Sequence, residues 1–197
     1  MKTGTKWGAD LENLKNGGFV KKAQIMDAQA MSRAITRISH EIIEKNKGAE
    51  GILLIGVRKR GYPIACRIAE RIREIEGVTL SVEGLDISFF RDDLHKNGDG
   101  PVITRDEISA SVDGATVVLV DDVIFTGRTV RAAIESVFSH GRPRAVQLAV
   151  LIDRGLRELP IRPDFVGKNI PTSHSERVCV SVSEIDGEDS VTITASK

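Results

Sequence analysis

The chain has 197 residues, of which 41% are apolar, and its 28 basic side chains balance its 28 acidic ones. This length and composition are typical of one globular domain, and the balanced charge argues against nucleic-acid binding through bulk positive charge. No apolar run approaches the roughly 20 residues of a membrane-spanning helix, and the N-terminus lacks the apolar core of a signal peptide. We therefore expect a cytoplasmic protein that makes no membrane contact.

Residues 1–20 contain four glycines and scattered charges without a hydrophobic period, which predicts a flexible N-terminal extension. A helix is then predicted from the N-cap Asp27 to about Lys47, because apolar residues recur at steps of three and four. Its apolar face consists of Met31, Ile35, Ile38 and Ile42. A short buried strand is predicted at 51–56, followed by an amphipathic helix at 62–76. The apolar stripe of that second helix consists of Ile64, Ile68, Ile72 and Ile75.

The turn Gly56-Val-Arg-Lys-Arg-Gly61 joins this strand to this helix. Glycines at both ends permit tight turns, while Arg58, Lys59 and Arg60 concentrate positive charge. A solvated basic turn and an anion-binding loop both fit this pattern. Arginine suits the second through bidentate contacts with phosphate oxygens.

Residues 78–90 are predicted to be extended, with apolar side chains at alternating positions over much of their length. They lead into a polar stretch from Arg91 to Arg105 that contains glycine and proline. This stretch is too irregular for a packed element and predicts a mobile loop.

Four apolar residues, Val117 to Val120, predict a buried strand that runs directly into two carboxylates, Asp121 and Asp122. The loop Phe125-Thr-Gly-Arg-Thr129 then opens a helix predicted at about 128–139. Backbone N–H groups at a helix N-terminus lack partners, and the helix dipole favours an anion, so this loop suits a phosphate. The acids suit sugar hydroxyls or a Mg²⁺ carried by the substrate. The alternative is an ordinary strand followed by a capped helix.

A further strand is predicted at 145–153, so strands and helices alternate along the chain. This alternation indicates an α/β fold on a mostly parallel sheet, in which ligands bind at the carboxyl ends of the strands. Proline-rich connections follow residue 154. Asp186-Gly187, between strands predicted at 177–185 and 190–194, indicates a hairpin.

The acid pair and the loop after it resemble the signature of the type I phosphoribosyltransferases, which bind phosphoribosyl pyrophosphate. The family pattern falls on Asp121, Asp122, Thr126, Gly127 and Thr129. The resemblance implies a central, mostly parallel sheet flanked by helices, within a single domain at 21–197 whose small C-terminal hood is formed largely by 154–197. It also implies that the acids hold the ribose hydroxyls and the loop holds the 5′-phosphate. Mg²⁺ is expected with the substrate, without direct protein ligands.

In that family the loop equivalent to 56–61 binds the pyrophosphate leaving group, and the mobile loop closes as a lid. The resemblance therefore implies a catalytic set of Asp121, Asp122, Arg60 and Arg91. It implies substrate contacts from Arg58, Lys59, Arg60, Asp121, Asp122, Val123, Ile124, Phe125, Thr126, Gly127, Arg128 and Thr129.

Longer strings are similar to the bacterial pyrimidine operon regulators that are also uracil phosphoribosyltransferases. These strings lie at 34–41, 90–93, 126–133 and 147–172, and the resemblance runs from about 23 to 194. It implies synthesis of UMP and pyrophosphate from uracil and phosphoribosyl pyrophosphate, and assembly as a homodimer or homotetramer. Phe165 or Val166 is expected to pack on the uracil ring, with Arg154 as a further base-site candidate; ordinary packing is the alternative for Phe165 and Val166.

Those regulators also bind a hairpin of pyrimidine-operon mRNA in response to uridine nucleotides such as UMP and UTP, which implies transcription attenuation. The matching RNA-binding positions are Thr36, Arg37, His40, Arg157 and Lys168. RNA loops are recognised through splayed bases and backbone contacts, so modest local charge is enough. Leu156 departs from the family, which has histidine there. A solvated helix face, and a transferase without an RNA role, remain the alternatives.

Overall fold

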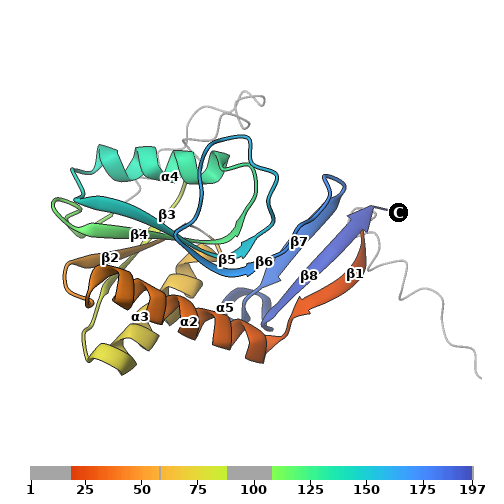
Figure 1. Ribbon diagram of the computed structural model, residues 1–197, viewed down its shortest axis with the longest axis horizontal. Coiled ribbons are helices and arrows are strands. Elements are labelled where there is room, and N and C mark those ends of the chain that lie inside the picture. The colour runs from red at the N-terminus through yellow and green to blue at the C-terminus, as the bar shows by residue number, and fades with distance from the viewer. Residues whose placement is uncertain (1–18, 58, 88–107, 197) are drawn as a thin grey trace, which may run out of the picture.

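The computed structural model describes residues 19–57, 59–87 and 108–196. Its centre is a sheet of five parallel strands in the order β3-β2-β4-β5-β6 (Figure 1). The strands are β2 (Ile52–Val57), β3 (Ser81–Leu85), β4 (Thr116–Ile124), β5 (Ala145–Asp153) and β6 (Phe165–Asn169). This arrangement confirms the predicted α/β class, with a sheet that is parallel throughout.

Helices cover both faces of the sheet (Figure 1). Helices α2 (Ala28–Asn46) and α3 (Gly61–Glu76) pack on one face, and α4 (Arg128–Ser139) packs on the other. Side chains of a strand alternate between faces, so Val118 and Val120 of β4 join the core beneath α2 and α3, while Val117 and Leu119 join the core beneath α4. The continuously apolar strands predicted from the sequence therefore reflect burial on both sides.

Helix α2 forms as predicted, because Asp27 caps its first turn and one face is apolar. The Asp27 side chain accepts a hydrogen bond from the Ala30 amide at 2.7 Å. In α3, Ile64, Ile68 and Ile72 are fully buried, but Ile75 is 39% exposed. The prediction that Ile75 belongs to the buried apolar stripe is wrong, since its side chain lies in the last turn of α3 and is accessible to solvent.

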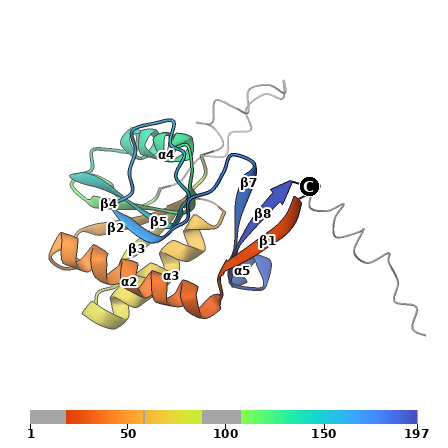
Figure 2. The same ribbon diagram turned by 45° about the vertical axis from the view of Figure 1, so that its right-hand side comes forward.

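A second, smaller sheet has the antiparallel order β1-β8-β7 and lies beside the main sheet (Figure 2). Its strands are β1 (Phe19–Met26), β7 (Glu176–Ser181) and β8 (Ser190–Ser196). Strand β1 was not predicted, and its first two residues fall in the segment expected to be an extension. Most of its side chains are exposed, so it has no hydrophobic period and depends on pairing with β8.

Two predicted elements differ in the C-terminal region. The strand predicted at 177–185 ends earlier, because a short helix, α5 (Ser183–Asp186), connects β7 to β8. Residues 165–169, which were assigned to the hood, instead form β6 at the edge of the main sheet. The loop predicted at 91–105 lies outside the described residues. No helix in the described part of the chain is both long and apolar enough to cross a membrane.

Replacing Asp27 by alanine tests the capping of α2. Loss of a side-chain cap destabilises a protein by about 1 kcal/mol, which corresponds to a fall of roughly 2–4 °C in the unfolding midpoint of a chain of this size. Thermal unfolding followed by circular dichroism measures the change. Asp27→Ser keeps an oxygen acceptor and should retain most of the stability, so equal losses in both variants would contradict the capping role.

Candidate active site

The acid pair lies at the carboxyl edge of the parallel sheet. Strand β4 continues through the acids to Ile124, so Asp121 and Asp122 belong to the end of the strand and do not follow it as predicted. Asp121 is level with Val150 of β5, and Val120 is level with Gly56 of β2. The acids therefore stand between the ends of two neighbouring strands, where parallel α/β sheets bind ligands.

Burial makes the acid pair electrostatically unusual. Asp121 is only 6% exposed, and one oxygen of each acid accepts the amide of the next residue at 2.9 Å. Burial raises the pKa of Asp121 well above its ordinary value, and the charge of Asp122 raises it further. Burial also raises the pKa of Asp122, while hydrogen bonds and the nearby charge of Arg60 act in the opposite direction. The pair is therefore poorly solvated and suited to a ligand that supplies hydroxyl donors or a cation.

The basic loop packs directly against the acid pair. A Cβ on Gly61 would lie 2.4 Å from the Val120 carbonyl oxygen and 3.2 Å from the Asp121 Cα. A Cβ on Gly56 would lie 2.3 Å from the Tyr62 Cα. Only glycine permits these close backbone approaches. The loop after β2 is thus brought beside the acids, with Lys59 exposed and Arg60 partly buried; Arg58 and Arg91 lie outside the described residues.

Two helices begin at this edge without a side-chain cap. Gly127 is the N-cap of α4, with a φ of 94° that favours glycine, and its carbonyl accepts the Arg131 amide at 2.9 Å. Arg60 is the N-cap of α3 and likewise provides no side-chain cap. By contrast, α2 is capped by Asp27. Neither N-cap side chain therefore occupies the N-terminus of its helix, an arrangement that suits an anion. In α3 the third helical residue, Pro63, has no N–H, and in α4 the Arg128 amide donates to the Thr126 hydroxyl at 3.4 Å.

The loop between β4 and α4 is held by its neighbours. The carbonyl of Thr126 accepts the amides of Glu158 and Leu159 at 3.0 and 3.1 Å, and Arg128 forms an ion pair with Glu158 at 2.8 Å. The segment that contains Glu158 and Leu159 therefore holds the loop in place. Among the other predicted contact residues, Ile124 is buried in the core beneath α4 and Val123 packs toward the opposite core, so their side chains support the fold.

Arg154 and Arg157 are engaged within the protein. Arg154 is 7% exposed, lies 4.1 Å from the ring centre of Phe125 and donates to Thr172, Ser173 and Glu176. The guanidinium of Arg157 donates to three carbonyl oxygens and to the Asp153 carboxylate, the last at 2.6 Å. Both arginines thus brace the loops around the site. The guanidinium of Arg157 is engaged by these contacts, and its expected part in RNA binding stays a prediction.

The two side chains predicted to contact the base point to opposite faces of the sheet. Phe165 is 2% exposed in the core beneath α2, and the Lys45 ammonium lies 5.4 Å from its ring centre. Val166 is partly exposed and packs on the α4 side. The ring of Phe165 is therefore packed inside the fold, as the alternative interpretation anticipated, and only Val166 remains accessible.

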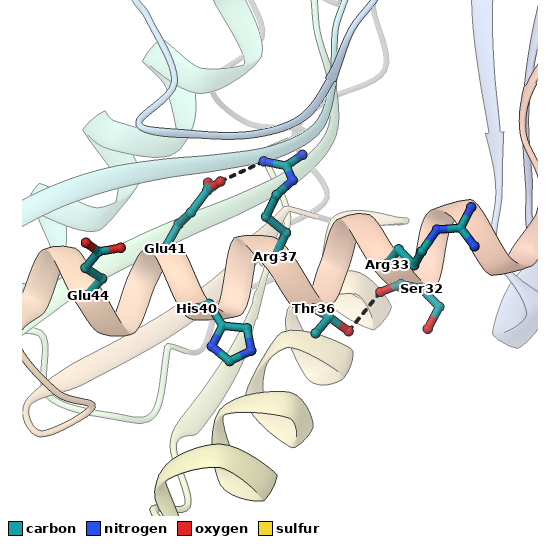
Figure 3. Close-up of a pocket in the computed structure, with 7 residues that line it drawn as sticks. All are labelled: Ser32, Arg33, Thr36, Arg37, His40, Glu41 and Glu44. Carbon is teal, nitrogen blue, oxygen red and sulfur yellow. Dashed lines mark hydrogen bonds and ion pairs between the residues drawn. The ribbon is translucent and has the colours of Figure 1, made fainter.

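The predicted RNA-binding side chains of α2 line a shallow depression of about 380 Å³ (Figure 3). Thr36, Arg37 and His40 lie there together with Ser32, Arg33, Glu41 and Glu44. Arg37 pairs with Glu41 at 2.7 Å and also donates to the carbonyls of Val166 and Gly167. The exposed Lys168 of β6 donates to the carbonyl of Ile25, just before α2, at 3.3 Å.

Asp186 was not predicted as a site residue, although it binds Arg60 through two hydrogen bonds of 3.0 and 2.8 Å. The only signal at this position was the Asp-Gly turn motif. Such a motif predicts a change of direction and does not identify a partner far away in the sequence.

Replacing Asp121 by asparagine tests the electrostatic description of the pair. Because the folded state raises the pKa of Asp121, this group favours folding most below its unfolded pKa, and the contribution is lost as pH rises through the folded pKa. The unfolding midpoints of variant and wild type should agree near the unfolded pKa of about 4. Toward neutral pH, the unfolding midpoint of the variant should rise increasingly above that of the wild type. The expected rise is roughly 2–4 °C for each kcal/mol by which the buried charge destabilises the wild type.

The exposed Glu50 provides the control for this comparison. Glu50→Gln should follow the wild type across the whole pH series. A midpoint of Asp121→Asn that never exceeds the wild-type value at neutral pH would contradict the description of a strained, buried carboxylate.

Known proteins with related sequences and structures match almost the whole described chain. Residues 21–183 match the phosphoribosyl transferase domain. "Bifunctional protein PyrR" of Clostridioides difficile is 57% identical over 89% of this chain and 99% of its own, and that of Clostridium kluyveri is 59% identical over 87% and 97%.

Two solved structures share the fold. A hypoxanthine-guanine phosphoribosyltransferase from Bacillus anthracis has a TM-score of 0.67 at 17% identity and covers 90% of this chain and 99% of its own. The hypoxanthine phosphoribosyltransferase of Trypanosoma cruzi has a TM-score of 0.68 at 18% identity, with 90% and 98% covered. The chain belongs to the phosphoribosyltransferase family and, within it, to the family of the bifunctional PyrR proteins.

Proposed function

We propose that the protein transfers the phosphoribosyl group of phosphoribosyl pyrophosphate to uracil, forming UMP and pyrophosphate. We propose further that it binds a pyrimidine-operon mRNA hairpin and regulates pyrimidine biosynthesis in response to uridine nucleotides. The observation that carries the catalytic proposal is the placement of the buried acid pair between two uncapped helix N-termini. This arrangement suits a ligand with a sugar between two phosphate groups.

The proposed roles follow from the geometry. Amides at the start of α4 and the hydroxyls of Thr126 and Thr129 bind the 5′-phosphate, while Asp121 and Asp122 orient the ribose hydroxyls. Lys59, Arg60 and the amides at the start of α3 bind the pyrophosphate. Breaking the anomeric C–O bond builds positive charge on the ribose and negative charge on pyrophosphate. Positioning and electrostatic stabilisation can therefore supply the rate without a protein nucleophile.

We propose that Mg²⁺ enters the site bound to the substrate. Among the described residues, no group of three or more His, Cys, Asp or Glu side chains could hold a metal ion. The phosphate oxygens of the substrate are the hard oxygen ligands that Mg²⁺ prefers, so the substrate would hold the ion without direct protein ligands. Bound in this way, Mg²⁺ would neutralise charge on the leaving pyrophosphate.

The acceptor base is proposed to bind near the exposed face of Val166, beside the loops braced by Arg154 and Arg157. Uracil is the proposed acceptor because the chain belongs to the family of the bifunctional PyrR proteins, and the regulators that its sequence resembles are uracil phosphoribosyltransferases. A purine acceptor is the competing proposal, since the two solved structures described above are named for hypoxanthine. The family context also supports a cytoplasmic homodimer or homotetramer built from one domain that begins near residue 21.

The RNA surface is proposed on the outer face of α2, with Thr36, Arg37, His40 and the neighbouring Lys168. Arg37 joins this face to β6 through the carbonyls of Val166 and Gly167, so the surface adjoins the strand proposed to receive the base. This contact offers a physical route by which a bound nucleotide affects RNA binding. A transferase without an RNA role remains the alternative.

Pyrophosphate release in the presence of uracil and Mg²⁺–phosphoribosyl pyrophosphate tests the catalytic proposal. Misplacing a reacting group by about 1 Å can reduce the rate roughly 10²-fold, so we expect Asp121→Asn to lose activity on this scale. Glu50→Gln should keep it. Equal activity of Asp121→Asn, or faster turnover with hypoxanthine than with uracil, would contradict the proposal.

A gel-shift with the pyrimidine-operon leader RNA, with and without UMP, tests the regulatory proposal. His40→Ala and Lys168→Ala should each weaken binding about tenfold, or about 1.4 kcal/mol, while uracil transfer is retained. Arg142, an exposed basic residue between α4 and β5, provides the control, and Arg142→Ala should bind normally. Absence of a UMP-dependent shift with wild-type protein would favour the transferase without an RNA role.

A further inference from the structure

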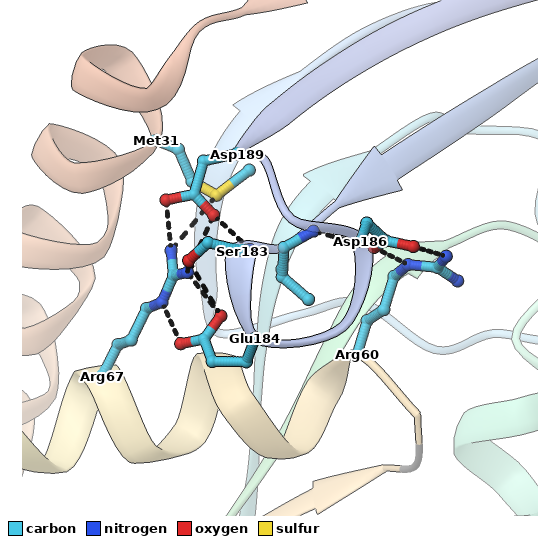
Figure 4. A network of polar contacts seen from close by, with 8 residues as sticks. Met31, Arg60, Arg67, Ser183, Glu184, Asp186 and Asp189 are labelled. Atoms are coloured by element: carbon cyan, nitrogen blue, oxygen red, sulfur yellow. Dashed lines mark hydrogen bonds and ion pairs between the residues drawn. The ribbon is translucent and has the colours of Figure 1, made fainter.

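The small C-terminal sheet contributes a charged side chain to the basic loop of the proposed pyrophosphate site. The carboxylate of Asp186, the last residue of α5, faces the guanidinium of Arg60 (Figure 4). Arg60 donates from Nε to Oδ2 at 3.0 Å and from Nη2 to Oδ1 at 2.8 Å. This is a two-point contact, which fixes the plane of the guanidinium as well as its position.

Asp186 is itself held in place. Its Oδ2 accepts the Val182 amide at 2.9 Å, and its own amide donates to the Val182 carbonyl at 2.7 Å. The hydrogen bonds to Arg60 lower the pKa of Asp186, and burial opposes this effect. The carboxylate is therefore an ionised group fixed by its own turn, and it can impose an orientation on Arg60.

The geometry of the pair leaves part of Arg60 available. Guanidinium has five N–H donors in a rigid fork. Asp186 engages the edge formed by Nε and Nη2, so the hydrogens of Nη1 point away from this carboxylate. Arg60 also lies close enough to Asp122 for its charge to lower the pKa of that acid. An arginine held on one edge and adjoining the acid pair is placed to bind an anion with its other edge.

Holding Arg60 in advance favours anion binding because a free arginine side chain loses rotamer entropy when it is fixed. A partner that fixes it before the ligand arrives removes much of that loss from the binding step. The negative charge of Asp186 acts in the other direction by weakening attraction to phosphate. If that second effect dominated, Asp186 would act as a competitor of the ligand, and its removal would tighten binding.

We propose that Asp186 is a positioning residue, which holds Arg60 on one edge so that its other edge binds the diphosphate of phosphoribosyl pyrophosphate. The small sheet β1-β8-β7, through α5, thereby completes the pyrophosphate site of the main sheet. The proposal rests on the proposed transferase function and extends it to a residue outside the sugar-phosphate signature.

The same turn contains a matched control. Arg67 of α3 binds Glu184 at 2.6 Å and Asp189 at 2.7 Å (Figure 4). These contacts join the same two parts of the fold as the Arg60–Asp186 pair, but they engage an arginine about two helical turns further along α3. Asp189→Asn therefore weakens the attachment of the turn to α3 without touching Arg60.

Calorimetric titration of Mg²⁺–pyrophosphate and Mg²⁺–phosphoribosyl pyrophosphate into wild type, Asp186→Asn and Asp189→Asn tests the proposal. We expect Asp186→Asn to weaken binding of both ligands about tenfold and to raise KM for phosphoribosyl pyrophosphate to the same extent. KM for uracil should stay within about twofold of the wild-type value. Asp189→Asn should lower thermal stability at least as much and leave both affinities unchanged.

Further variants separate positioning from a purely structural effect. Asp186→Glu keeps the charge and should recover part of the lost affinity. In an Arg60→Lys background, which lacks the fork, Asp186→Asn should have little further effect on ligand binding. Equal or tighter binding by Asp186→Asn, or an equal loss of affinity in Asp189→Asn, would overturn the proposal. Failure of wild type to bind either ligand would overturn the proposed function as well.

Discussion

Two carboxylates at the end of a buried parallel strand are the constraint on which the site depends. Solvent cannot fully stabilise their charges, because β4 is covered by helices on both faces and Asp121 is almost entirely buried. A protein that only needed stability would gain by replacing such a group. Asp121 lies at the carboxyl edge of the sheet, where ligands bind. A ligand there can supply the hydroxyl donors or the cation that the protein itself does not provide to this carboxylate.

Close backbone packing brings the remaining site elements to these acids. Gly56 and Gly61 let the basic loop fold tightly and press against Val120 and Asp121. Gly127 allows β4 to turn into α4 with a left-handed backbone conformation. In both places a helix begins beside the acids without a side-chain cap. The polypeptide thus places two helix N-termini and the basic side chains Lys59 and Arg60 around the two acids.

The features that could be predicted from the sequence are those determined by neighbouring residues. The cap of α2, its isoleucine stripe and the strand-acid-loop-helix order around Asp121 each depend on a few adjacent positions. Features set by distant partners were missed or misplaced. Strand β1 has little apolar pattern and is defined by β8, and the direction of Phe165 follows from its register with β5. Arg60 finds its partner Asp186, which lies far away in the sequence, only after the chain has folded.

The central claim is that burial in the fold raises the pKa of Asp121 and that a bound ligand supplying hydroxyl donors or a cation lowers it. Titration of its side-chain carboxyl by carbon NMR, with and without Mg²⁺–phosphoribosyl pyrophosphate, measures this directly. We expect the free protein to show a pKa well above the ordinary value of about 3.9 and the ligand to lower it. An ordinary pKa in the free protein, unchanged by the ligand, would contradict the claim.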